Sequence, residues 1–293
     1  MGQSYEAWTQ FLANKSNKFN LAKFQQRFPE QEYNRKREAL TCVDFTYEVD
    51  GLTVVGYYMK PKAAADKALP VIIFNRGGNG AFGSVNFAKK MGFIADLAEL
   101  GYVVIGSQYR GASRKFIENN GEDEFGGADV NDVLALESLL SDIPDADPSR
   151  IAMMGWSRGG MQSFLAAKHM PKLKTIVAIA SNADARKSLA FRPDMENVYK
   201  KRVPYYAGNK DEALSARSVI DWIDELPAQA PILLVHGSAD KRVNVEQSRL
   251  LAKALSEQSH QHKLVIYEEG NHGLQRHRQA LIKDVKEWLS LYL

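Results

Sequence analysis

Short runs of apolar residues recur along the chain from residue 71 onward, and each run is apolar on both faces of an extended segment. Such runs are typical of strands buried in a parallel sheet. They cover residues 71–74, 102–105, 151–154, 175–179, 232–235 and 264–266. Helical spacing of apolar residues fills the intervals at 87–100, 128–142, 158–169, 244–258 and 275–292. This alternation predicts an α/β fold with a doubly wound, mostly parallel sheet.

The sheet is preceded by a segment with a different period. Residues 42–49 alternate between apolar and polar positions, Asp50-Gly51 follows, and residues 53–58 resume an extended pattern. An Asp-Gly pair between two alternating segments favours a tight turn. We therefore expect an antiparallel β-hairpin to enter the sheet.

The ends and interruptions of this pattern predict the domain organisation. Residues 3–28 place aromatic and aliphatic side chains at helical spacing, which predicts two short amphipathic helices. We expect an N-terminal helical extension over residues 1–40 and one α/β domain over residues 41–293. Residues 181–229 are longer than one connecting helix requires, and they form either a small helical cap over the site or a peripheral loop with helices.

Composition narrows the class of protein. The 293 residues carry a formal net charge of +3 with no run of like charges, so we expect no nucleic-acid partner. Cys42 is the only cysteine, so no internal disulfide forms. The sequence contains neither an apolar stretch of about 20 residues nor a secretory signal, which predicts no membrane partner and a cytoplasmic location. A secreted or periplasmic location follows instead if a signal peptide has been removed; the oligomeric state stays open.

One serine lies in a setting typical of a nucleophile. Gly155-Trp156-Ser157-Arg158-Gly159 matches the pattern G-x-S-x-G and falls between a predicted strand and a predicted helix. Such a strand-turn-helix setting is the nucleophile elbow of α/β-hydrolases. The serine then lies at a helix N-terminus, where free N–H groups favour a developing negative charge. We predict that Ser157 is the nucleophile and that the Arg158 N–H is an oxyanion donor.

A serine nucleophile requires a base and an acid that orients it. Asp240 follows one predicted strand, and His272 follows the next. Both therefore belong at the carboxyl edge of the sheet, where ligand sites of such folds form, in the chain order Ser, Asp, His. We predict Asp240 as the acid and His272 as the base, with Glu268 and Glu269 as weaker candidates for the acid.

The other histidines fit a catalytic base less well. They are His169, His236, His260, His262 and His277, in helix, strand-end or polar loop contexts. His260 and His262 are close enough to suggest a metal pair, but no Cys- or His-rich motif accompanies them. We expect a surface pair and no metal site.

Several motifs together resemble one known family. They are NRGGN at 75–79, QYRGA at 108–112, EFGGADVND at 124–132, GWSRGG at 155–160, HGSAD at 236–240 and GNHG at 270–273. With these motifs, residues 70–290 resemble the catalytic domain of the prolyl oligopeptidase family of serine peptidases. Several are shared with dienelactone hydrolases and acetyl esterases. The resemblance implies the α/β-hydrolase fold.

Two departures from the family pattern affect the expected site. Members usually carry a β-propeller before the catalytic domain, whereas only about 40 residues precede the hairpin here, so we expect no propeller. Arg76 stands where members commonly have Tyr or His, so no tyrosine hydroxyl is expected there. A backbone N–H of Gly78, or of Gly77, is then expected to partner the Arg158 N–H in the oxyanion hole, with Arg76 beside it.

These residues predict a serine hydrolase that cleaves an ester or peptide bond through an acyl-enzyme. Its expected partner is a small ester or a short peptide, and no metal or organic cofactor is implied. The alternative is a carboxylesterase, an acetyl esterase or a dienelactone-hydrolase-like enzyme. A non-catalytic relative is less favoured, because the elbow glycines, the serine, the acid and the histidine are all present.

Overall fold

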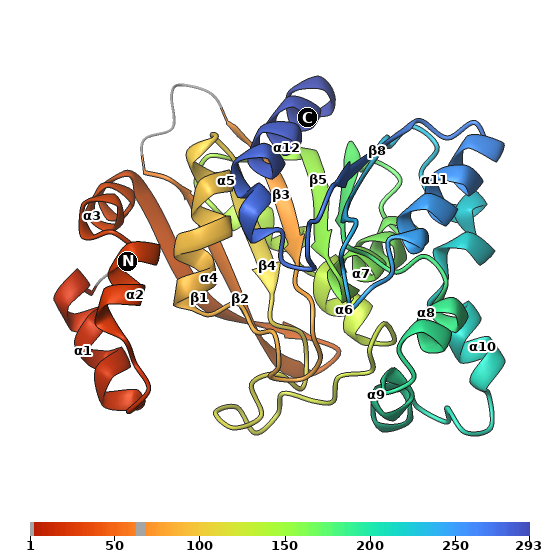
Figure 1. Cartoon of the computed structure of the whole chain (residues 1–293), viewed down its shortest axis with the longest axis horizontal. Helices are drawn as coiled ribbons and strands as arrows, with labels where there is room; N and C mark the ends of the chain where they lie inside the picture. Colours follow the sequence, from red (N-terminus) through yellow and green to blue (C-terminus); the bar gives the residue numbers. More distant parts are fainter. Residues whose placement is uncertain (1–2, 63–67) are drawn as a thin grey trace.

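The structure, a computed structural model, describes residues 3–62 and 68–293 and has one eight-stranded sheet at its centre (Figure 1). The strands are β1 (Leu40–Val49), β2 (Leu52–Pro61), β3 (Leu69–Asn75), β4 (Val103–Ser107), β5 (Ala146–Trp156), β6 (Thr175–Ile179), β7 (Ile232–Gly237) and β8 (His262–Tyr267). Their order across the sheet is β1-β2-β4-β3-β5-β6-β7-β8. The hairpin β1–β2 and the pair β2–β4 are antiparallel, and all other pairs are parallel. The predicted doubly wound, mostly parallel sheet is confirmed.

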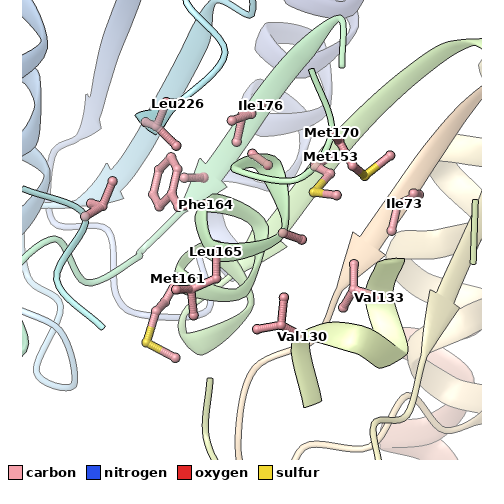
Figure 2. Packing of buried hydrophobic residues seen from close by; sticks show 14 of the residues in the cluster. Ile73, Val130, Val133, Met153, Met161, Phe164, Leu165, Met170, Ile176 and Leu226 are labelled. Carbon is pink, nitrogen blue, oxygen red and sulfur yellow. The ribbon is translucent and has the colours of Figure 1, made fainter. Parts of the chain in front are cut away.

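Helices cover both faces of this sheet. They are α5 (Ala95–Glu99) and α12 (Arg278–Tyr292) on one face, and α6 (Asp129–Leu134), α7 (Arg158–Ala167) and α11 (Glu246–Glu257) on the other. Neighbouring residues of β3 point to opposite faces: Ile72 belongs to the core with α5 and α12, and Ile73 to the core with α6 and α7. On the face covered by α6, α7 and α11, Val133 of α6 and Phe164 of α7 pack against the sheet (Figure 2).

Three N-terminal helices precede the sheet and lie beside β1 and β2 (Figure 1). They are α1 (Tyr5–Lys15), α2 (Leu21–Arg27) and α3 (Glu30–Ala39). Trp8 is 3% exposed, and its ring lies 4.7 Å from those of Phe24 and Phe87. The Lys36 ammonium of α3 lies 2.6 Å from the Asp96 carboxylate of α5. An aromatic cluster and an ion pair therefore dock this segment onto the α/β body.

Two predicted helices are less regular than their sequence pattern. Residues 87–100 form α4 (Phe87–Lys89), a π-helical turn (Lys90–Ile94) and α5. Residues 128–142 form α6 and a 3₁₀ turn (Ser138–Asp142).

The interval between β6 and β7 contains α8 (Ala185–Phe191), α9 (Met195–Arg202), α10 (Lys210–Ser215) and two 3₁₀ turns (Val219–Asp221 and Ile223–Glu225). In Figure 1, α8–α10 lie at the opposite end of the sheet from α1–α3.

Candidate active site

Ser157 stands alone between the end of β5 and the start of α7. Its backbone has φ 59° and ψ −124°, a conformation that non-glycine residues adopt only where the surrounding structure enforces it. A Cβ on Gly155 would lie 2.0 Å from the Gly159 carbonyl oxygen, and one on Gly159 would lie 1.9 Å from the Asn75 carbonyl oxygen. Glycine is therefore required on both sides of the serine, as the nucleophile-elbow motif predicts.

The carboxylate of Asp240 contacts His272, as their placement after neighbouring strands predicts. Asp240 Oδ2 lies 2.7 Å from His272 Nδ1, and Oδ1 accepts the N–H groups of Arg242 at 2.7 Å and Val243 at 3.1 Å. Burial by itself raises the pKa of Asp240. Hydrogen bonds from His236, His272 and the Arg242 N–H outweigh burial, so the pKa lies well below its usual range. Asp240 is thus an ionised acceptor that orients the His272 ring.

A second histidine, His236, also contacts Asp240, a contact that was not predicted from the sequence. Its Nε2 lies 3.3 Å from Asp240 Oδ2 and 3.0 Å from the Val243 carbonyl oxygen, while its Nδ1 lies 2.7 Å from Ser248 Oγ. Two acceptors face Nε2, so we assign the proton to Nε2, with Nδ1 accepting from the serine hydroxyl. The sequence feature that could have indicated this contact is a histidine at the end of an apolar strand. A buried polar group needs hydrogen-bond partners, so a histidine in that position must contact other polar groups.

Further contacts hold the segment after β8 and the segment after β3 against the elbow. Trp156 Nε1 donates to the His272 carbonyl oxygen at 2.9 Å. A Cβ on Gly77 would lie 3.1 Å from Ser157 Cβ, so the backbone of this glycine passes directly beside the serine. Gly78 has φ +82°, and a Cβ there would lie 2.2 Å from the Phe82 carbonyl oxygen. The loop that follows β3, residues 76–83, therefore lies next to Ser157.

Arg76 lies beneath this loop, and its guanidinium donates to backbone carbonyls. The acceptors are Gln108 (2.8 Å from Nε), Gly80 (2.8 Å from Nη2), Gly77 (3.1 Å from Nη1) and Phe82 (3.2 Å from Nη1). The side chain is 1% exposed. Burial, with the nearby charge of Arg158, lowers the pKa of Arg76 to about 10. Arg76 is thus a brace that fixes the carbonyls of the loop.

The side chain of Arg158 connects the elbow to the same loop. Its Nη1 donates to the Gly78 carbonyl oxygen at 3.0 Å and to Asp123 Oδ2 at 2.7 Å, and its Nη2 lies 2.5 Å from Asp129 Oδ2. Asp123 also accepts the N–H of Gly80. All three charged side chains are at most 2% exposed. The elbow and the loop are therefore joined through one buried ionic cluster.

Arg110 of the QYRGA motif and Asp132 of the EFGGADVND motif form a buried ion pair. Arg110 Nη2 lies 2.7 Å from Asp132 Oδ1, and the Arg110 N–H donates to Asp132 Oδ2 at 2.7 Å. Asp50, in the hairpin turn, lies 2.6 Å from the same Nη2. Asp129, the other acid of the motif, pairs with Arg158 instead. These contacts tie α6 to the strand ends that carry the site.

Ser157 and His272 line one cavity of about 1250 Å³. Its walls also include Phe28 and Tyr33 from the N-terminal segment and Met195 from α9. The segments before the sheet and between β6 and β7 thus both contribute to the cavity.

Comparison with known proteins assigns the chain to a family. The sequence profile of the prolyl oligopeptidase family matches residues 90–293. The chain belongs to the prolyl oligopeptidase family. As a member of this family, with peptidases among its relatives, it is a serine hydrolase. The Ser, Asp and His segments all lie within the matched residues.

Relatives in the family differ in how much of their length the chain covers. The uncharacterized peptidase YtmA of Bacillus subtilis is 28% identical over 72% of this chain and 78% of its own length. Human dipeptidyl peptidase 8 is 24% identical over 78% of this chain but only 26% of its own length. The chain therefore corresponds to about a quarter of this longer relative.

Solved structures share the fold. The acylaminoacyl peptidase of Pyrococcus horikoshii superposes with a TM-score of 0.74 at 24% identity, over 89% of this chain and 43% of that chain. A Klebsiella pneumoniae protein described as a dienelactone hydrolase superposes with a TM-score of 0.64 at 19% identity, over 87% of this chain and 100% of that chain. The α/β-hydrolase fold predicted from the sequence is confirmed.

The described residues contain neither a membrane-spanning helix nor a cluster of metal ligands. Across residues 3–62 and 68–293, no helix is both long and apolar enough to cross a bilayer. Within the same ranges, no three His, Cys, Asp or Glu side chains are placed to hold a metal ion.

Proposed function

We propose that the protein hydrolyses short acyl peptides or small acyl esters through an acyl-enzyme on Ser157. The observation that carries this proposal is the 2.7 Å contact of His272 Nδ1 with Asp240 Oδ2, in a histidine that shares its cavity with an elbow serine. Because Nδ1–H donates to the carboxylate, Nε2 of His272 is free to accept a proton. A neutral serine hydroxyl needs such a base to act as a nucleophile.

The reaction has two halves, formation of the acyl-enzyme and its hydrolysis, and each half includes two proton transfers. Ser157 Oγ attacks the carbonyl carbon of the substrate while its proton passes to His272 Nε2, and Asp240 stabilises the resulting imidazolium. His272 then returns the proton to the departing amine or alcohol, which leaves an ester of the acyl group on Ser157. A water molecule repeats the sequence on this ester, releases the acid and restores the serine.

The negative charge on the substrate oxygen needs two fixed donors. We assign one to the Arg158 N–H, at the first turn of α7, and the other to the N–H of Gly78 or Gly77. The bracing of residues 76–83 by Arg76 and the Arg158 side chain supports this assignment, because donors that do not reorganise during the reaction stabilise charge best.

The cavity walls favour small substrates. We assign residues 1–40 to an N-terminal extension of the catalytic domain (41–293), and residues 181–229 to a cap. Phe28 and Tyr33 from the first and Arg192, Met195 and Val198 from the second line the cavity. A site enclosed from two sides admits an extended peptide or a small ester more readily than a folded protein.

We expect a fluorophosphonate probe to label the protein at Ser157 and kcat/KM to be measurable for acetyl and butyryl esters and for aminoacyl anilides. Cleavage of a casein-type protein should be far slower. Comparing amide with ester substrates separates a peptidase from an esterase, which share every step above. No labelling, or protein cleavage as fast as ester cleavage, would contradict the proposed function.

We expect His236→Asn to lower kcat/KM about tenfold, because Asp240 loses a charge-assisted hydrogen bond. The carboxylate then interacts more strongly with the His272 imidazolium, so the acid limb of the pH profile of kcat/KM should shift to higher pH. A shift of the acid limb would show that His236 acts through Asp240 and does not only stabilise the fold.

The matched control for His236→Asn is Ser248→Ala. This change removes the partner of His236 Nδ1 but keeps the Nε2–H that faces Asp240. We expect it to lower the unfolding midpoint without moving the acid limb. An acid limb that stays in place in His236→Asn would show that His236 does not act through Asp240.

A further inference from the structure

Among the described residues, five cationic side chains line the cavity without a carboxylate at ion-pair distance: Arg27, Arg76, Lys89, Arg192 and Arg242. Arg76 is buried against backbone carbonyls and Arg27 lies over the Phe28 ring, which leaves Lys89 at the end of α4, Arg192 after α8 and Arg242 after β7. Lys89 Nζ donates to the carbonyl oxygens of Gly83 at 2.5 Å and Ser84 at 2.9 Å. Across residues 3–62 and 68–293, none of the three takes part in an ion pair. No carboxylate at ion-pair distance therefore neutralises these three charges.

Negative charge in the cavity walls is already neutralised. Among the described lining residues, the only carboxylates are those of Glu32 and Asp96. Glu32 lies 2.5 Å from Arg35 and 3.7 Å from Lys36, and Asp96 lies 2.6 Å from Lys36 and 2.9 Å from Arg278. The unpaired charges that remain are positive. Low-dielectric walls concentrate such a potential inside a cavity.

Two of the unpaired cations belong to segments that touch the reacting residues. Lys89 is bonded to the carbonyl of Gly83, and a Cβ on Gly83 would lie 2.4 Å from the Gly77 carbonyl oxygen. Gly77 in turn lies against Ser157. On the other side, the N–H of Arg242 donates to Asp240. The positive charge therefore lies on two segments that adjoin the site. One contacts the loop after β3, and the other is the loop that carries Asp240.

A further cation, outside the cavity lining, contacts the loop after β3. Arg202, at the end of α9, places Nε 3.3 Å from Asn79 Oδ1, and its Nη2 would lie 2.5 Å from a Cβ on Gly80. Among the described residues it has no ion-pair partner either. Lys89, Arg192 and Arg242 thus bring positive charge to the cavity wall from three separate segments.

We infer that the preferred substrate carries a carboxylate within one or two residues of the scissile bond. Arginine and lysine pair with carboxylates through charge-assisted hydrogen bonds. Two extended residues span roughly 7 Å, so such a carboxylate stays within the cavity while the carbonyl meets Ser157. The inference rests on the proposed function, which leaves the charge of the substrate open. The carboxylate is either a free peptide C-terminus on the leaving side or an acidic group on the acyl side.

Two matched substrate pairs test the inference and separate these sources. N-acetyl-Ala-Ala is compared with its C-terminal amide for the leaving side, and succinyl-Ala-p-nitroanilide with acetyl-Ala-p-nitroanilide for the acyl side. We expect kcat/KM to favour the carboxylate in at least one pair by about tenfold at low ionic strength. The advantage should shrink at about 0.5 M salt, where charges are screened.

Arg192→Gln, Arg242→Gln and Lys89→Gln are each expected to reduce the preference ratio in that pair. The control is Arg249→Gln, an exposed arginine of α11 that pairs only with Glu246 and should leave the ratio unchanged. Ratios near one in both pairs, with neutral substrates still cleaved, would overturn the inference but leave the proposed function standing. No cleavage of any substrate and no fluorophosphonate labelling would overturn both.

Discussion

Ser157→Ala is expected to abolish fluorophosphonate labelling and to lower kcat/KM by at least about 10³-fold. The hydroxyl is the atom that attacks in the proposed reaction, and alanine leaves nothing in its place. Alanine fits the elbow backbone as serine does, so the free energy of unfolding should change by less than about 1 kcal/mol. Labelling, steady-state kinetics and a denaturant titration measure the three quantities.

Ser290→Ala is the matched control for this variant. Ser290 is an exposed serine of α12, with its hydroxyl bonded to the Glu287 carbonyl oxygen. Its replacement should keep both labelling and kcat/KM. If Ser157→Ala were labelled as well as the unaltered protein, the nucleophile would have to be sought elsewhere.

Asp240→Asn is expected to lower kcat by about 10⁴-fold, the size of effect seen when a triad aspartate is made an amide. Two N–H groups, from Arg242 and Val243, face Oδ1, so the amide oxygen must take that position. The NH₂ group then replaces Oδ2 and donates to His272 Nδ1. The histidine proton is forced onto Nε2, and the base can no longer accept the serine proton.

Glu268→Gln and Glu269→Gln are the controls for the acid. Glu268 Oε1 accepts from Ser238 Oγ at 3.0 Å and lies on the exposed side of the loop. Both variants should keep near-normal kcat. A large loss in either, with Asp240→Asn still active, would move the acid to that glutamate.

Much of the sheet can be predicted from the sequence because strands buried on both faces leave short apolar runs. The contact between Asp240 and His272 follows from the same pattern, since neighbouring parallel strands end at one edge. The glycines around Ser157 are equally predictable, because the elbow leaves no room for a Cβ. These features depend on local sequence and on general rules of the fold.

Features that depend on distant contacts escape such reasoning. Helix α3 has a charged sequence in which only Tyr33 and Lys36 are buried, so it shows no apolar stripe. Its stability comes from partners such as Asp96, which is 60 residues away. The hydrogen bonds of the π-helical turn at residues 90–94 span five residues instead of the four of an α-helix, a difference that apolar spacing does not resolve.

The role of a buried polar group is equally hidden in the sequence. His236 looks like part of an apolar strand until the fold places Asp240 beside it. Arg76 is expected from its sequence position to lie beside the oxyanion hole, but its donors turn inward to the carbonyls of its own loop. Residue type and position alone do not give the direction of a side chain.

The buried cluster around Arg158 limits where an engineer could alter the specificity of this enzyme. Any uncharged residue at position 158 would leave Asp123 and Asp129 unpaired in a dry interior, which typically costs about 3–5 kcal/mol. Most members of a combinatorial library at this position would therefore lose a large part of the free energy of folding, which for typical domains is about 5–15 kcal/mol. Phe82 is 67% exposed at the cavity wall and tolerates replacement without such a penalty, so it is the better position to diversify.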